Sequence, residues 1–130
     1  MPLTPYPATK TSEDPQKYTD LAPEIYRQRL VIEGYPRTPI AGEAIKQYLT
    51  ELSEVCGMKT LIEPVTHLSD TYGWAGWIHW ETSGSHFYAW DQPVLFFSVD
   101  IYTCKSFDPQ KAVAFTREFL DATEVTFKDF

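Results

Sequence analysis

The stretch PVLFFSVDIYTCKSFDPQKA, residues 93–112, decides the fold class of this 130-residue chain. Its first half is the most hydrophobic run in the sequence and predicts a central strand over residues 94–103. Asp108 followed by Pro109 predicts a helix start, because the carboxylate caps the first turn and proline occupies a position whose N–H has no helical partner. Apolar residues then recur at helical spacing, namely Ala112, Phe115, Phe119 and Leu120.

The same kinds of signal recur on either side of this stretch. Residues 26–35 alternate and are rich in branched side chains, so they predict a first strand. Thr38-Pro39 predicts the start of a helix that ends at Gly57. Further strands are predicted over residues 58–65, 74–81, 85–90 and 124–127, with Thr82, Ser83 and Gly84 forming a turn. This order predicts an α+β two-layer sandwich, with both helices on one face of a mostly antiparallel sheet.

The length of the chain indicates a single domain. Residues 1–23 hold five of the ten prolines and predict an extended arm, which leaves residues 24–130 as the domain. The N-terminus has no apolar core typical of a signal peptide, and no run is long enough to span a membrane. Two cysteines do not suggest a disulfide framework, so we expect a cytoplasmic protein.

The charge of the chain narrows the classes of partner. Eleven Lys and Arg residues stand against eighteen Asp and Glu residues, for a net charge of −7. Such a surface repels phosphate backbones and anionic lipids, so nucleic acid and membrane surfaces are poor partners. It attracts cations, and the four tryptophans can hold a cationic amine against their ring faces.

A metal site is not predicted. His79 and Glu81 lie on one side of a predicted strand, yet nothing else in the sequence supplies ligands at the spacing that metal sites use. Phosphate-binding loops and nucleophile-elbow motifs are also missing from the sequence.

Two segments combine residues that can carry covalent chemistry. Residues 80–93 place Ser83, Ser85 and His86 around a tight turn, and residues 99–112 end a strand on Cys104. A hydroxyl at a strained turn beside a thiol suits nucleophilic chemistry. The alternative is an ordinary hairpin and a cysteine that packs well at a strand end.

The second segment, Val99-Asp100-Ile101-Tyr102-Thr103-Cys104 followed by Asp108-Pro109-x-Lys111-Ala112, resembles the short bacterial and archaeal type of the S-adenosylmethionine decarboxylase family. The likeness extends over most of residues 26–127. It includes Gly73-x-Ala75-Gly76. The resemblance implies a protomer that dimerises through its sheet and cuts itself before a serine. That serine becomes a pyruvoyl group, whose carbonyl accepts electrons as carbon dioxide leaves the substrate.

The resemblance also implies roles for individual residues. Gapless spacing from Gly76 makes Ser83 the pyruvoyl precursor, with Ser85 as second choice, and Cys104 inherits the role of proton donor. His86 or Tyr88 would act as the acid–base group. The residues implied in substrate binding are His67, Glu81, Trp90 and Asp91.

The chain departs from the family at several of these positions. The family's Glu-Ser-His falls on Thr82-Ser83-Gly84, Tyr88 stands where a processing histidine is usual, and Ala75 replaces a hydroxyl residue. Three readings stay open. The chain is a self-processing decarboxylase, or an unprocessed homologue that binds S-adenosylmethionine or a polyamine and regulates an active paralogous subunit, or an enzyme that performs another reaction on the same ligand.

Three structural expectations follow. We expect Ser83, Tyr88, Asp91 and Cys104 to converge on a site for S-adenosylmethionine or another cationic amine. We expect Gly84 to adopt the positive φ of a turn. We also expect the segments 74–80 and 94–103 to form an aromatic sheet face that is covered in a homodimer or higher oligomer.

Overall fold

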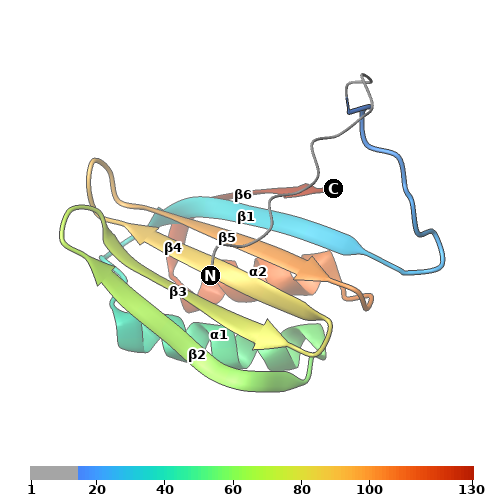
Figure 1. Cartoon of the computed structure of the whole chain (residues 1–130). Helices are drawn as coiled ribbons and strands as arrows, with labels where there is room; N and C mark the ends of the chain where they lie inside the picture. The colour runs from blue at the N-terminus through green and yellow to red at the C-terminus, as the bar shows by residue number, and fades with distance from the viewer. Residues whose placement is uncertain (1–14) are drawn as a thin grey trace, which may run out of the picture.

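Six antiparallel strands form one sheet in the computed structural model, which describes residues 15–130 (Figure 1). The strands lie in the order β2-β3-β4-β5-β1-β6. Helix α1 packs against β2 and β3, helix α2 against β6 and β1, and the two helices contact each other. In chain order the elements are β1 (Gln28–Pro36), α1 (Gly42–Cys56), β2 (Thr60–Ser69), β3 (Gly73–Trp80), β4 (Ser83–Trp90), β5 (Phe96–Thr103), α2 (Pro109–Phe119) and β6 (Ala122–Asp129). The predicted α+β two-layer sandwich is confirmed, with β4 and β5 at its centre.

The two helices begin and end for different reasons. Asp108 caps α2 as predicted, because its side chain accepts a hydrogen bond of 2.9 Å from the N–H of Gln110. Gly57 ends α1 in the left-handed conformation, also as predicted, with φ of 68°. The start predicted at Thr38 is wrong, because α1 begins at Gly42 with Ala41 as its N-cap and without a side-chain cap.

The hairpin between β3 and β4 differs from the prediction. Trp80 pairs with Ser83, so the loop consists of Glu81 and Thr82 alone. The positive φ belongs to Thr82, at 62°, and not to Gly84, which lies inside the strand ladder. Gly84 is needed there for a different reason: a Cβ atom on it would lie 3.0 Å from the carbonyl oxygen of Ile78.

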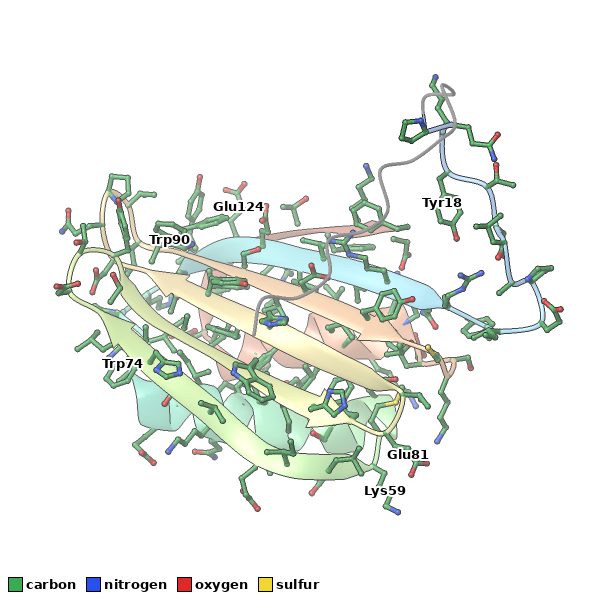
Figure 2. All side chains as sticks on the ribbon, in the orientation of Figure 1. Tyr18, Lys59, Trp74, Glu81, Trp90 and Glu124 are labelled. Atoms are coloured by element: carbon green, nitrogen blue, oxygen red, sulfur yellow. The ribbon has the colours of Figure 1, made fainter. Side chains whose placement is uncertain are left out.

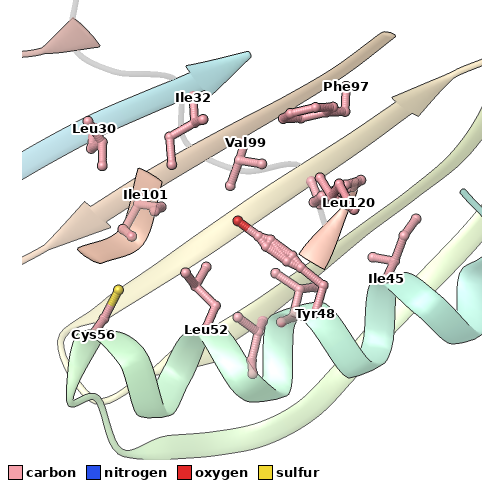
Figure 3. Packing of buried hydrophobic residues seen from close by; sticks show 14 of the residues in the cluster. Leu30, Ile32, Ile45, Tyr48, Leu52, Cys56, Phe97, Val99, Ile101 and Leu120 are labelled. Carbon is pink, nitrogen blue, oxygen red and sulfur yellow. The ribbon is translucent and has the colours of Figure 1, made fainter. Parts of the chain in front are cut away.

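The core lies between the sheet and the helices (Figure 3). Tyr48 of α1 is fully buried, and its hydroxyl is 2.7 Å from the hydroxyl of Thr116 on α2, which links the two helices. Trp80 is also fully buried and donates a hydrogen bond of 2.7 Å to Ser53. These two hydrogen bonds pair buried polar groups across elements, which fixes how the helices sit on the sheet. Burial raises the pKa of the Cys56 thiol to about 12.

Within residues 15–130, one face of the sheet carries no helix. This face is mixed in character, and we call it the open face. Strand alternation sends Trp77 to this face but Trp74 and Trp80 toward the helices, so the expectation that residues 74–80 line one aromatic face is only half right. On the four central strands the open face carries both rings and charges: Arg29, Val31, Glu33, Tyr35, Ala75, Trp77, His79, His86, Tyr88, Trp90, Phe96, Ser98, Asp100 and Tyr102.

The segment before β1 has neither helix nor strand over residues 15–27. In Figure 1 it leads away from the sheet. An ion pair between Asp20 and Arg27 closes a bend within it, and the N–H of Ala22 together with Arg27 lowers the pKa of Asp20. The rest of the predicted arm, residues 1–14, lies outside the described residues. Between residues 15 and 130 no helix is long and apolar enough to cross a membrane.

Candidate functional site

Ser83 and Cys104 lie in direct contact at one end of the sheet. Strands β4 and β5 are antiparallel, and Gly84 pairs with Tyr102, so the start of β4 lies beside the end of β5. The backbone N–H of Cys104 donates a hydrogen bond of 3.2 Å to the Ser83 hydroxyl oxygen. Ser83 is 6% exposed and Cys104 is half-buried. The structure therefore brings together the two residues for which the sequence predicts covalent chemistry.

Three loops meet at this end of the molecule and hold the hairpin in place. The N–H of Glu81 donates a hydrogen bond of 2.9 Å to the carbonyl of Lys59, and their side chains form an ion pair at 3.8 Å (Figure 2). Lys105 Nζ donates a hydrogen bond of 2.9 Å to the carbonyl of Gly57. The carboxylate of Glu81 thus points at Lys59 on the surface, which does not support its expected contact with substrate.

The residue before Ser83 is held in a costly conformation. Thr82 is β-branched, and its φ of 62° places it in the left-handed region that such residues avoid. This conformation costs roughly 1–2 kcal/mol. The two-residue loop imposes it, because β3 and β4 are paired directly up to Trp80 and Ser83. Backbone strain is therefore stored in Thr82, the residue whose carbonyl group forms the peptide bond to Ser83.

A groove of about 560 Å³ lies on the open face beside this hairpin. Arg29 donates two hydrogen bonds to Asp100 across its floor, at 3.0 and 2.8 Å, and this contact raises the pKa of Arg29. The opposite charges of Arg29 and Asp100 cancel, so this pair adds no net charge to the groove. The lining residues come from four strands and one turn: Arg29, Trp77, Ile78, His79, Thr82, Ser83, Gly84, Ser85, His86, Asp100 and Tyr102.

Two of the predicted residues besides Ser83 also line this groove. His86 lies on the open face, paired in register with Trp77 on one side and Asp100 on the other. Ser85 is 2% exposed, and its hydroxyl has no hydrogen-bond partner, alone among the buried side-chain polar atoms of residues 15–130. An unpaired buried hydroxyl is costly, which makes Ser85 unusual as a purely structural residue.

Three of the other predicted residues, Tyr88, Trp90 and Asp91, lie toward the far end of β4 from Ser83, where Figure 2 labels Trp90. Tyr88 is five residues beyond Ser83 along β4, roughly 17 Å at the rise of a strand, and it lies on the other face. Trp90 packs against Tyr72 with ring centroids 5.2 Å apart, and the N–H of Asp91 donates to the carbonyl of Tyr72. The expected convergence of Tyr88 and Asp91 on Ser83 is therefore wrong within one protomer.

His67 also lies away from Ser83. We expected it in a loop, but β2 extends to Ser69, and His67 pairs with Ala75 inside the ladder. The strand continues past the end predicted at residue 65, because residues 66–69 pair in register with residues 76–73 of β3. Among residues 15–130 no group of three or more potential metal ligands gathers in space.

Two groove residues were not predicted from the sequence. Tyr102 supplies a second aromatic ring besides Trp77, and Asp100 anchors Arg29. Asp100 carried a signal, because a carboxylate inside a strand as apolar as residues 94–103 must face a polar side or a partner. The strain at Thr82 could not be predicted from the sequence, because it depends on which residues form the last pair between β3 and β4.

Comparison with known proteins identifies the family. The model of the family described as S-adenosylmethionine decarboxylase matches residues 37–130. The chain belongs to this family. Its fold is similar to the crystal structure of the adenosylmethionine decarboxylase from Aquifex aeolicus, at 14% sequence identity and a TM-score of 0.66, over 82% of this chain and 89% of that one. No curated protein sequence is significantly similar to the chain.

The family match spans both segments that hold the candidate site. Residues 37–130 contain Ser83, Cys104 and every groove residue except Arg29. The S-adenosylmethionine decarboxylase fold thus covers both the hairpin and the strand end on which the site is built.

Proposed function

We propose that this chain cleaves itself between Thr82 and Ser83 and then decarboxylates S-adenosylmethionine. The observation that carries the proposal is the contact between the Ser83 hydroxyl and the backbone of Cys104. It places a nucleophile beside the residue that carries the thiol, directly after the strained residue Thr82. A conformation that costs free energy before cleavage and none after it favours the reaction.

Every bond formed and broken in the cleavage can be accounted for with Thr82, Ser83 and water. The Ser83 hydroxyl adds to the carbonyl carbon of Thr82, the amide nitrogen leaves, and the peptide bond becomes an ester. Elimination across the Cα–Cβ bond of Ser83 then releases a carboxylate on Thr82 and leaves a dehydroalanine. Water replaces its nitrogen, ammonia leaves, and a pyruvoyl group remains at the new N-terminus.

The surroundings of Ser83 fit that group. Bound at this position, a pyruvoyl carbonyl supplies an acceptor for the electrons that carbon dioxide leaves behind. The thiol of Cys104 is the group we assign to return a proton to the substrate carbon. Trp77 and Tyr102 offer ring faces to the sulfonium cation. The groove volume of about 560 Å³ falls within the range of about 300–1,000 Å³ for small-molecule sites.

The product of this reaction would enter spermidine synthesis, so we propose a role in polyamine biosynthesis. The two cysteines are free in the structure, which suits a reducing compartment such as the cytoplasm.

A second candidate is supported by the position of Tyr88. The acid–base residue expected beside the serine lies on the other face and roughly 17 Å away, so cleavage lacks that helper. An uncleaved chain would still hold the groove and would bind S-adenosylmethionine or a polyamine, as a regulatory subunit of an active paralogue or as an enzyme for another reaction on that ligand.

Two serine variants test the cleavage site. We expect Ser83→Ala to stay as one chain, and Ser85→Ala to be cut as the wild type is, because only Ser83 adjoins the strained bond and Cys104. Both serines are buried on the same strand, so each variant is the other's control. Cleavage that survives in Ser83→Ala and is lost in Ser85→Ala would move the reaction to the Gly84–Ser85 bond.

Calorimetry with uncleaved Ser83→Ala separates ligand binding from processing. We expect S-adenosylmethionine to bind about two- to thirtyfold tighter than its neutral demethylated thioether, because a cation near ring faces gains about 0.5–2 kcal/mol. Spermidine tests whether any cation suffices. Equal binding of all three ligands, or none, would contradict a sulfonium site.

A further inference from the structure

The two edges of the sheet differ in how open they are to another strand. One edge is β2, whose pairing with β3 shifts register twice and which carries Pro64 in its middle. The other edge is β6, which pairs with β1 without a break from Glu124 to Asp129. Irregular edges resist pairing with a further strand, while a regular edge invites it. Strand β6 is therefore the edge on which another strand can add.

The backbone N–H and carbonyl groups of β6 point alternately toward β1 and away from the sheet. The N–H of Phe130 donates to the carbonyl of Arg29 at 3.0 Å, so even-numbered residues of β6 direct their N–H and carbonyl groups toward β1. The groups of Val125, Phe127 and Asp129 then point away from the sheet.

We propose that β6 pairs with β6 of a second copy of this chain, antiparallel and centred on Thr126, so that two sheets join edge to edge. In this register Val125 lies opposite Phe127 of the other copy, and both have outward backbone groups. Thr126 lies opposite itself, in a pair that exchanges no backbone hydrogen bonds. The symmetric arrangement uses the outward groups of both strands.

The charges of β6 favour this register, because it is the one that sets Glu124 opposite Lys128 of the other copy. Glu124 and Lys128 share the open face, and neither forms an ion pair within residues 15–130. Lys128 Nζ lies instead over the ring of Phe130, 4.8 Å from its centroid. Centred on Thr126, the pairing sets each Glu124 opposite the other copy's Lys128, at roughly 4.5–5.5 Å between Cβ atoms. Shifting the centre two residues either way sets Glu124 opposite Glu124 or Lys128 opposite Lys128.

The apolar residues agree with the same register. Phe127 is 42% exposed in the single chain, although it lies on the helix side of the sheet. Its partner in the proposed pairing is Val125, which packs on the edge of the core. Pairing would extend the core across the junction, and burial of such side chains favours association.

A charge exchange tests the proposal in the full-length protein. We expect Glu124→Lys and Lys128→Glu each to weaken self-association about tenfold or more in sedimentation equilibrium, because each opposes like charges twice across the two-fold axis. The double variant Glu124→Lys/Lys128→Glu restores the opposite pairs, and we expect its association to return to within about threefold of the wild type. Association unchanged in the single variants, or not rescued in the double one, would overturn the proposal.

A crosslink tests the register independently of overall association. We expect Thr126→Cys to form a disulfide-linked dimer on mild oxidation, because residues opposite each other in such a pair lie within the Cα separation a disulfide needs. The matched control is Glu124→Cys on the same strand and face, whose symmetric mate lies roughly 14 Å away along the strand. Equal crosslinking of the two variants, or none in Thr126→Cys, would refute this register.

Discussion

At the scale of single residues, Thr82 and Ser83 have different roles in the proposed reaction. Thr82 has a strained backbone conformation, and Ser83 supplies the nucleophilic oxygen, which accepts a hydrogen bond from the backbone of Cys104. The sequence predicted that Ser83 and Cys104 meet, because antiparallel neighbours bring a strand start beside a strand end. It placed the positive φ on Gly84, since glycine is the usual residue there, and the pairing of Trp80 with Ser83 moves it to Thr82.

Relief of this strain is testable. In the uncleaved Ser83→Ala background, we expect Thr82→Gly to raise the free energy of unfolding by about 1 kcal/mol, because glycine adopts φ near 62° without steric cost. With Ser83 present, the same change should slow cleavage. Denaturant titration and the rate of chain cutting measure the two effects.

Asp121→Gly provides the matched control. Asp121 also has a positive φ, at 48°, but lies at the turn between α2 and β6. We expect it to leave the cleavage rate unchanged. A Thr82→Gly protein that is cut as fast as the wild type would show that strain plays no part in the reaction.

At the scale of elements, the start of a helix could be predicted from the sequence where a side chain caps it. Asp108-Pro109 predicted α2 correctly, whereas Thr38-Pro39 gave a start three residues early for α1, because Ala41 caps α1 through its backbone alone. Strand length explains the site residues that were misplaced. An eight-residue strand such as β4 spans roughly 25 Å, so Ser83 and Trp90 at its two ends cannot share one site in a protomer.

The cap of α2 bears on the site because the loop before it contains Cys104. We expect Asp108→Ala to lower the free energy of unfolding by about 1 kcal/mol, since the N–H of Gln110 loses its acceptor. Asp108→Asn keeps an acceptor and should cost less. Chemical denaturation of the wild type and the two variants measures the difference. Equal stability of all three would show that the cap does not stabilise the protein.

At the scale of the whole molecule, the open face is the side of the sheet on which neither α1 nor α2 packs. It carries several rings, among them Trp77, Tyr88 and Phe96, together with the ion pair of Arg29 and Asp100. Such a surface suits an interface better than solvent, and we propose that it is covered by a second copy. The edge pairing through β6 uses a different surface, so both contacts can exist in one assembly.

Sedimentation of a face variant tests this cover. We expect the wild type to be a dimer or larger at micromolar concentration. We expect Tyr35→Glu to remove the contact through the open face and leave at most the dimer joined through β6, because Tyr35 is 46% exposed on the open face. Leu21→Glu is the matched control, since Leu21 is exposed but lies in the segment before β1. A wild type that stays monomeric, or equal effects of both variants, would contradict an interface on the open face.

The intact mass of the purified wild-type protein tests the central claim most directly. We expect two chains, residues 1–82 ending in a free carboxylate and residues 83–130 beginning with a blocked pyruvoyl group, because Ser83 and the strained Thr82 peptide unit are positioned for cleavage. A single uncut mass of 15.0 kDa would contradict self-cleavage and leave the ligand-binding candidate in its place.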